Sequence, residues 1–149
     1  MAFRFVIMKY KIEVNENQLS MLEYACEFIA RTRMGQLDLS GLQCICEEMW
    51  CKQHKKKVGD PEWYDMREKL EQTLNDIKWD CWGFYKGQSG GVHFDSRADA
   101  FWDMYQCLRH ARYLSFDEND KELMRHTVMA DKPMQFGDEP LIKVERKDD

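Results

Sequence analysis

Residues 100–114, AFWDMYQCLRHARYL, carry apolar side chains three and four positions apart, which predicts an amphipathic helix. Asp95 or Ser96 supplies an N-cap ahead of it, so we expect the helix to extend from there to about Leu114. The same stretch holds three basic residues within two turns: Arg109, His110 and Arg112. A helix that only fills a core has no need of them. We therefore predict a partly buried helix with one basic, aromatic side.

Two helices with recognisable starts are expected in the first third of the chain. Asn15 and Gln18 have the spacing of a capping box and open a first helix, which ends at Gly35 because glycine favours the left-handed position after a helix. Ser40 and Gln43 repeat the capping-box spacing and open a second helix.

The second helix ends in the run KQHKKK, which places Lys52 and residues 55–57 at the negative end of the helix dipole. Such a run is either a solvated helix end or a phosphate-binding patch, since nothing in it restricts geometry. A third helix begins with Asp60 as its N-cap and Pro61 at its first position, and it extends to Cys81.

Three short segments predict strands. Residues 3–14 alternate apolar and polar side chains toward their end, residues 92–94 follow a glycine-rich loop, and residues 140–145 read PLIKVE. Residues 121–129 are either a short helix or an irregular segment. The expected fold class is α+β: one mainly helical domain over residues 1–149, with a small antiparallel sheet formed by the N-terminal, central and C-terminal strands.

Composition excludes several classes of protein. The chain has 149 residues, 44% of them hydrophobic, and a net charge of −5, which argues against a general nucleic-acid binder. No stretch predicts a membrane span or a signal peptide, so we expect a cytoplasmic protein. The first seven residues either belong to the natural start or precede a start at Met8.

The six cysteines are expected to be reduced thiols rather than a disulfide framework. The nearest approach to a metal-binding pattern joins Cys44, Cys46, Cys51 and His54. On a helix Cys46 points nearly opposite to Cys44 and Cys51, so the four cannot hold one ion. We predict no metal and no cofactor.

The helix over 100–114 brings Tyr105, Arg109, Arg112 and Tyr113 to one side, because they are three and four positions apart. Guanidinium groups beside aromatic rings suit phosphate and base recognition. The alternative is that Arg109 and Arg112 pair with carboxylates of a neighbouring helix. Residue spacing does not distinguish a ligand site from such internal ion pairs.

Two further groups could contribute to an anion site. Arg31 and Arg33 lie in the last turn of the first helix, with Gln36 just beyond it, and they either bind a ligand or complement the helix dipole. Phe84 and Tyr85 lie in the glycine-rich loop, where they could cover a base or simply form a mobile tip. No catalytic constellation accompanies them, since the four histidines are scattered.

Three stretches resemble a family of small phage-encoded proteins over about half of the chain: VNENQLSMLEYACEFIARTRMGQLD, AFWDMYQCLRHARYL and DKPMQFGDEPLIKVE. In that family a first helix ends in an arginine followed by MGQ, and a later helix carries YQ..RH. The chain also looks similar to phage anti-defence sponges, which sequester cyclic nucleotide signals of bacterial immune systems such as Thoeris and CBASS. The residues that carry the resemblance are Arg31, Arg33, Met34, Gly35, Gln36, Tyr105, Arg109 and His110.

What the resemblance implies is a non-enzymatic, oligomeric protein that binds an anionic, nucleotide-derived small molecule in the host cytoplasm. Arg112, Phe84 and Tyr85 join the expected site on physical grounds alone. Two other functions fit the sequence. One is a protein-interaction module that inhibits a host enzyme, and the other is a hydrolase of the same signals.

Overall fold

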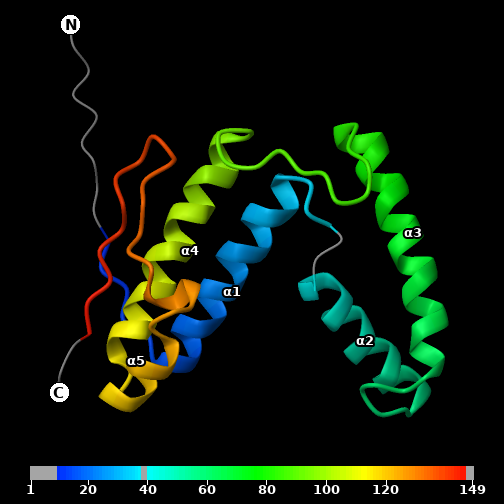
Figure 1. Ribbon diagram of the computed structural model, residues 1–149, viewed down its shortest axis with the longest axis horizontal. Coiled ribbons are helices and arrows are strands. Elements are labelled where there is room, and N and C mark those ends of the chain that lie inside the picture. The colour runs from blue at the N-terminus through cyan, green and yellow to red at the C-terminus, as the bar shows by residue number, and fades with distance from the viewer. Residues whose placement is uncertain (1–9, 38–39, 147–149) are drawn as a thin grey trace, which may run out of the picture.

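The computed structural model describes residues 10–37 and 40–146. Within them the chain forms a series of helices with bounds as follows: α1 (Glu16–Arg33), α2 (Ser40–His54), α3 (Glu62–Trp82), α4 (Ser96–Ser115), the short α5 (Glu118–Met124) and a single 3-10 turn, η1 (Val128–Ala130). Figure 1 shows α1 and α4 side by side, with α2 and α3 forming a separate hairpin.

The predicted α+β sheet is wrong, because no strand forms among the described residues. Residues 3–9 of the first expected strand lie outside the described part, and residues 10–14 are irregular, with Tyr10 83% exposed. Residues 92–94 form a turn, and residues 140–145 are extended but do not pair with another strand. Alternating side chains alone do not make a strand, since its main-chain groups need a hydrogen-bonded neighbour.

The centre of the molecule is the antiparallel pair of α1 and α4, whose opposite ends meet through Arg33–Asp95 and Glu23–Arg112 contacts. Ala30 and Ala98 are fully buried where the helices approach closely. Around them the core is built from a small set of apolar side chains: Leu19, Cys26, Met34, Phe101, Trp102, Tyr105, Leu108 and Val144.

The helix ends follow local chemistry. At the start of α1, Gln18 N donates to Asn15 Oδ1 at 2.9 Å, and Asn15 N donates to Gln18 Oε1 at 3.0 Å, which confirms the predicted capping box. Gly35 follows α1 with φ of +76°. Asp95 caps α4 by accepting hydrogen bonds from the main-chain amides of Arg97 and Ala98.

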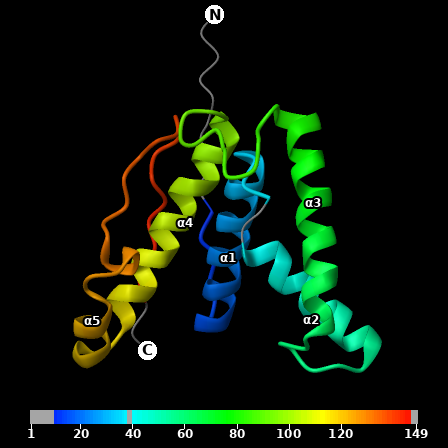
Figure 2. The same ribbon diagram turned by 45° about the vertical axis from the view of Figure 1, so that its right-hand side comes forward.

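The hairpin of α2 and α3 forms an arm that stands apart from the α1–α4 pair in Figure 2. The rings of Trp50 and Trp63 pack together inside it, with centroids 5.8 Å apart. Helix α3 begins at Glu62, two residues after the predicted cap, although the Asp60 carboxylate still accepts from Glu62 N. The capping pair expected at the start of α2 involves side chains outside the described set.

Both ends of the arm join the α1–α4 pair at one place. The Gly90 amide donates to the Met34 carbonyl at 2.9 Å, although 55 residues separate the two in the sequence (90 − 34 − 1). Beside this bond, the Phe84 ring packs over Gly35, and Trp82 Nε1 donates to the Arg33 carbonyl at 3.3 Å. The junction therefore fixes the root of the arm.

After α5 and η1 the chain turns back along α4. Residues 131–146 have no helix or strand, and Figure 1 shows them running beside α4 in orange and red. This extended course covers one side of the helix whose other side packs on α1.

Candidate functional site

Arg31 is engaged within its own chain. Its Nε donates to Glu27 Oε1 at 2.8 Å and its Nη1 donates to Gln36 Oε1 at 2.9 Å. Its guanidinium carbon lies 5.2 Å from the centroid of the Trp102 ring. Gln36 in turn donates to Ser89 Oγ at 3.2 Å, so both predicted ligand residues are tied into the junction of α1 and the glycine-rich loop.

Arg33 forms a bidentate ion pair with Asp95. Its Nε and Nη2 donate to the two carboxylate oxygens at 3.0 Å and 2.7 Å. The Arg33 hydrogen bond, helped by the Ala98 amide, lowers the pKa of Asp95 to about 2. The pair joins the end of α1 to the start of α4, and a ligand would have to displace a carboxylate to use Arg33.

Arg112, in the last turn of α4, is paired through a single contact with the middle of α1. Its Nη1 donates to Oε2 of Glu23, a glutamate that is only 8% exposed. The Nε of Arg112 is buried and has no hydrogen-bond partner. Part of this guanidinium is thus neutralised while one of its donors remains unused.

Arg109 differs from the other three arginines. It is 5% exposed and forms no ion pair with any described residue. Its Nη2 donates to the Asp131 carbonyl at a long 3.4 Å, and its Nε is buried without a partner. The guanidinium carbon lies 5.2 Å from the centroid of the Tyr105 ring. Arg109 is a buried cation with a weak neutral acceptor and an aromatic face.

Tyr105 and His110, the two other residues of α4 that carry the resemblance, have different surroundings. Tyr105 is 6% exposed and belongs to the α1–α4 core, where its ring lies 5.0 Å from that of Trp102. His110 has a buried Nδ1 without a hydrogen-bond partner, and its ring stacks at 6.0 Å on Tyr113. Three adjacent basic side chains of α4 therefore each keep an unsatisfied nitrogen: Arg109, His110 and Arg112.

The predicted loop aromatics lie away from Arg109. Phe84 is half-buried over Gly35 and touches Phe94 at a ring distance of 5.4 Å. Tyr85 is 65% exposed and packs on Trp79 of α3 at 4.7 Å. Both belong to the root of the arm rather than to the basic side of α4.

The two arginine clusters occupy opposite ends of the α1–α4 pair. Arg31 contacts Trp102, which precedes Arg109 by seven residues in α4. That separation is about 10 Å along a helix axis. The structure therefore brings Arg109 to Tyr105 and Asp131 and turns Arg112 toward Glu23 of α1. Arg31, Arg33 and Gln36 lie at the junction with the loop.

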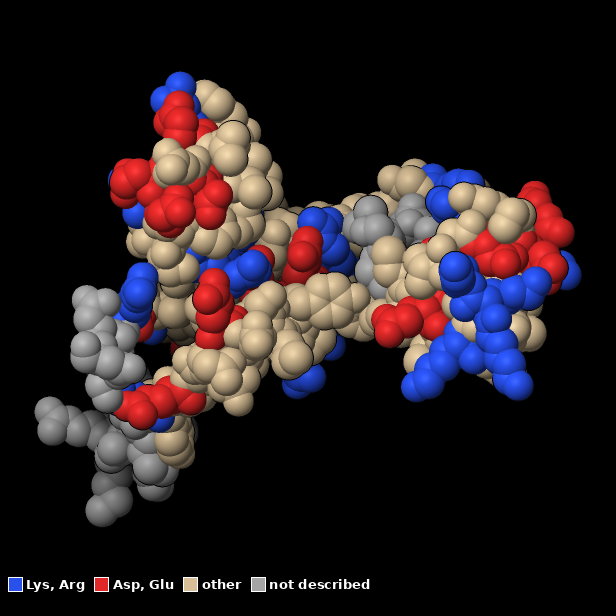
Figure 3. All heavy atoms as spheres, turned by 90° about the horizontal axis from the view of Figure 1, so that it is seen from below, with Lys and Arg blue, Asp and Glu red and all other residues tan. Residues whose placement is uncertain are grey.

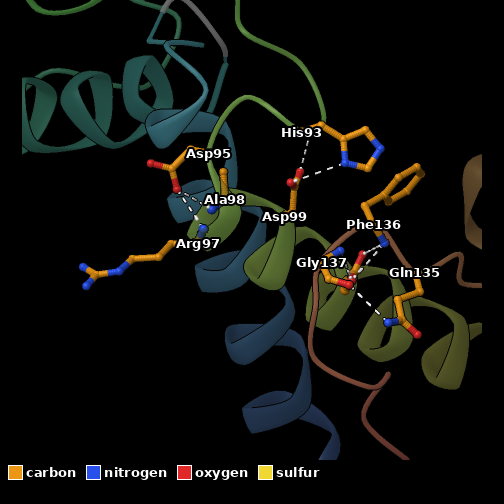
Figure 4. Close-up of polar contacts among 9 residues, drawn as sticks. His93, Asp95, Arg97, Ala98, Asp99, Gln135, Phe136 and Gly137 are labelled. Carbon is orange, nitrogen blue, oxygen red and sulfur yellow. Dashed lines mark hydrogen bonds and ion pairs between the residues drawn. The ribbon is translucent and has the colours of Figure 1, made fainter.

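Sequence reasoning missed a second polar side of α4, formed by Asp99, Asp103 and Gln106, all buried. Asp103 accepts hydrogen bonds from the amides of Phe136 and Gly137, as Figure 4 shows. Asp99 accepts from the amide of His93 at 2.8 Å. The repeat of aspartates at positions 95, 99 and 103 is a sequence signal for this side, because residues four apart share a helix face.

His93 also carries an unusual backbone conformation, with φ of +64°. Its Nδ1 lies 3.7 Å from Asp99 Oδ2, and its ring meets the edge of Phe136 at 5.9 Å. Figure 4 shows the imidazole beside Phe136 of the C-terminal segment. The pair thus links the start of α4 to that segment.

Charge is unevenly distributed over the surface. Figure 3 shows Lys and Arg side chains gathered at the far end of the arm, where Lys52, Lys55 and Lys57 are exposed. Lys56 is instead paired with Glu62 at 2.8 Å. Because α2 ends in this run, the pattern fits a solvated helix end.

The cysteines are free thiols. Burial raises the pKa of Cys26 and Cys107 in the α1–α4 region and that of Cys51 in the arm. Over residues 10–37 and 40–146, no group of three or more His, Cys, Asp or Glu side chains is arranged to hold a metal ion.

In the part of the chain that the structure describes, every helix is too short or too polar to cross a lipid bilayer. Comparison of the chain with protein-family models, with curated proteins and with solved structures finds no significant match.

Proposed function

We propose that the chain is a non-enzymatic binding protein that sequesters an anionic, nucleotide-derived small molecule at Arg109. The observation that carries the proposal is the state of this side chain. Arg109 is 5% exposed, has no ion pair among the described residues, and leaves its Nε without a hydrogen bond. A buried guanidinium in this state is poised for an anion.

Energetics support a ligand for Arg109. Burying a charge without an ionic partner costs several kcal/mol of folding free energy. Within the described part of the chain, Arg109 gains only the Tyr105 ring contact and the long hydrogen bond to the Asp131 carbonyl. A ligand oxygen bound to Arg109 would offset that cost.

The surroundings favour phosphate attached to an aromatic group. The Tyr105 ring lies against the Arg109 guanidinium, and the unused nitrogens of His110 and Arg112 are on the same stretch of α4. A guanidinium with a free donor beside an aromatic ring suits a charged oxygen attached to an aromatic group. Arg31 and Arg33 are less suited to this role because carboxylates already occupy them.

The test is isothermal titration calorimetry with cyclic ADP-ribose isomers and cyclic dinucleotides. Arg109→Met should weaken binding by about 2–4 kcal/mol, the range for loss of one partner of a buried charge pair. It should leave thermal stability unchanged or raised. Arg97→Met, at an exposed position of the same helix, is the control and should bind as the wild type does.

Two results would count against the proposal. One is wild-type protein that binds none of these nucleotides, and the other is full affinity in Arg109→Met. A clear fall in the melting temperature of Arg109→Met would assign the arginine to the fold instead. Recovery of the intact ligand after heat denaturation would separate sequestration from hydrolysis.

A second candidate function is a protein-interaction module, and the surface of the arm favours it. Large apolar side chains of the arm and its root are exposed: Ile45, Met49, Tyr64, Met66, Ile77, Trp79 and Tyr85. Exposed aromatic and methionine side chains are typical of binding surfaces. Stoichiometric capture of one host protein by wild type and its loss in Trp79→Ser, with Leu123→Ser on α5 as control, would support this function.

A further inference from the structure

Residues 131–137 form a strap over the polar side of α4, and its attachment is unusual. Each of its hydrogen bonds to α4 joins a main-chain atom of the strap to a side chain of the helix. Gln106 donates to the Met134 carbonyl at 3.0 Å and accepts from the Met134 amide at 3.2 Å. Asp103 accepts from the amides of Phe136 and Gly137, the latter at 2.8 Å.

The strap ends at Arg109. The Asp131 carbonyl accepts the Arg109 Nη2 hydrogen bond at 3.4 Å, the longest of the bonds between the strap and α4. The order of partners along α4 thus runs opposite to that along the strap: Arg109 with 131, Gln106 with 134, and Asp103 with 136 and 137.

The strap is held without a buried side chain. Pro133, Phe136 and Gly137 are half-buried, and the remaining four residues of the strap are exposed. Little apolar area therefore resists its opening, and water can replace most of its hydrogen bonds. Segments of this kind open locally without unfolding the core beneath them.

We infer that the strap is a built-in competitor for the anion site, with the Asp131 carbonyl standing where a ligand oxygen would bind. Strap closure and anion binding are then mutually exclusive, and the strap lifts from Arg109 when the ligand arrives. The ligand part of this inference rests on the proposed function. The opening of the strap does not.

The kind of acceptor that the strap presents to Arg109, a main-chain carbonyl, supports its displacement by a ligand oxygen. A carbonyl oxygen is neutral, whereas a phosphate oxygen carries charge and forms a stronger hydrogen bond with a guanidinium. A carboxylate from the strap would neutralise Arg109 and be hard to displace, but the exposed side chain of Asp131 forms no ion pair with it. The long carbonyl contact satisfies Arg109 only weakly and leaves its Nε free.

Gly137 offers a way to lift the strap without touching Arg109. A Cβ at this position would lie 3.2 Å from the Ala100 amide nitrogen and 3.3 Å from Asp103 Oδ2. The first neighbour is helix backbone and cannot give way, and the second is the carboxylate that holds the strap. Gly137→Val should therefore push the strap away from α4, and Glu139→Val introduces the same side chain at an exposed position as the control.

The first test needs no ligand. Amide hydrogen exchange measured by NMR should show Phe136 and Gly137 exchanging at least about tenfold faster than the α4 core amides of Tyr105 and Leu108. Gly137→Val should increase the exchange rates of the strap alone, and Glu139→Val should leave them unchanged. Strap amides that exchange only as slowly as the α4 core would overturn the inference.

The second test is calorimetric titration of the full chain with pyrophosphate, followed by cyclic ADP-ribose isomers. Gly137→Val should bind about tenfold more tightly than wild type. In the wild type the strap must first open, which lowers the apparent affinity, whereas in the variant it is already open. Gln106→Met, which removes both Met134 hydrogen bonds, should act in the same direction if Gly137→Val does not fold.

The outcomes separate the two proposals. Tighter binding by the strap variants supports competition. Equal or weaker binding by folded strap variants, with wild type still binding, overturns the competitor and leaves the proposed function standing. Absence of binding in wild type and in the strap variants overturns the proposed function and the competition together, whatever the exchange rates of the strap.

Discussion

The pairing of Arg33 with Asp95 makes a single carboxylate responsible for part of the acid sensitivity of the fold. The pKa of Asp95 is lowered to about 2 in the folded chain, against about 3.9 when unfolded. A lowered pKa stabilises the fold above the unfolded value, and the stabilisation is lost as pH falls from about 4 toward 2.

We expect Asp95→Asn to lower the free energy of unfolding at pH 5, through loss of the ion pair and a weaker cap on α4. The difference in the free energy of unfolding between wild type and variant should be smaller at pH 2.5 than at pH 5. Urea denaturation at the two pH values measures it. A difference that stays constant would show that Asp95 titrates normally in the folded chain.

Gly35 combines a left-handed backbone with a close neighbour, and the two effects can be separated. A Cβ at Gly35 would lie 2.8 Å from Cδ2 of Phe84, whereas one at Gly87, with a similar φ of +79°, meets nothing within 4 Å. Gly87→Ala should cost about 1 kcal/mol from backbone strain alone. Gly35→Ala should cost more, since Phe84 must move, and equal losses of stability in thermal unfolding would contradict the contact.

At the level of the helix, what the sequence could predict was set by local chemistry. The capping box of Asn15 and Gln18, the turn at Gly35 and the Asp95 cap depend on residues a few positions apart, and all three form. The strands could not be judged in this way, because a strand needs a distant partner that no short pattern specifies.

The buried face of α1 also depends on a distant partner that a short sequence pattern does not specify. Leu22 and Cys26 are apolar and four positions apart, which suggests one buried face, yet Leu22 is 42% exposed and Glu23 beside it is buried. Glu23 lies inward because Arg112 of α4 pairs with it. Only knowledge of which helix packs on α1 could have identified that face.

We expect Glu23→Ala to destabilise the chain by about 1–3 kcal/mol, because it leaves Arg112 half-buried without its carboxylate. Adding Arg112→Ala should recover part of that loss, giving a favourable coupling energy in a double-mutant cycle. Chemical denaturation of the four proteins provides the measurement. Strictly additive effects would mean that the pair contributes nothing to helix packing.

For the candidate site, the sequence identified the basic side of α4 but not the strap. Tyr105, Arg109 and Arg112 were found from helical spacing, whereas residues 131–137 have no periodicity and bind through their main chain. The strap nevertheless lies on the same helix, since the Gln106 side chain bonds the main chain of Met134.

For the whole molecule, the exposed apolar side chains favour association of several copies. Met49 on the arm is 59% exposed, and Leu123 on α5 is 76% exposed. We propose that copies associate through the arm, where Ile45 and Trp79 of the same helix pair are exposed as well as Met49. Light scattering after gel filtration should show a mass above 17.9 kDa that falls toward the monomer on dilution.

Met49→Asp should shift this equilibrium to the monomer, because a charge placed in an apolar interface is costly to desolvate. Leu123→Asp, away from the arm, is the matched control and should leave the mass unchanged. A single 17.9 kDa species at every concentration would exclude self-association.

The hydrogen bond between Met34 and Gly90 has a consequence for how this chain can vary. It makes residues 35–89 an insertion whose entry and exit coincide, so the arm can lengthen, shrink or be exchanged without changing the register of α1 against α4. A shortened chain with a tight turn in place of the arm should keep the helix pair and its basic side, and copies from different sources should differ most in the arm.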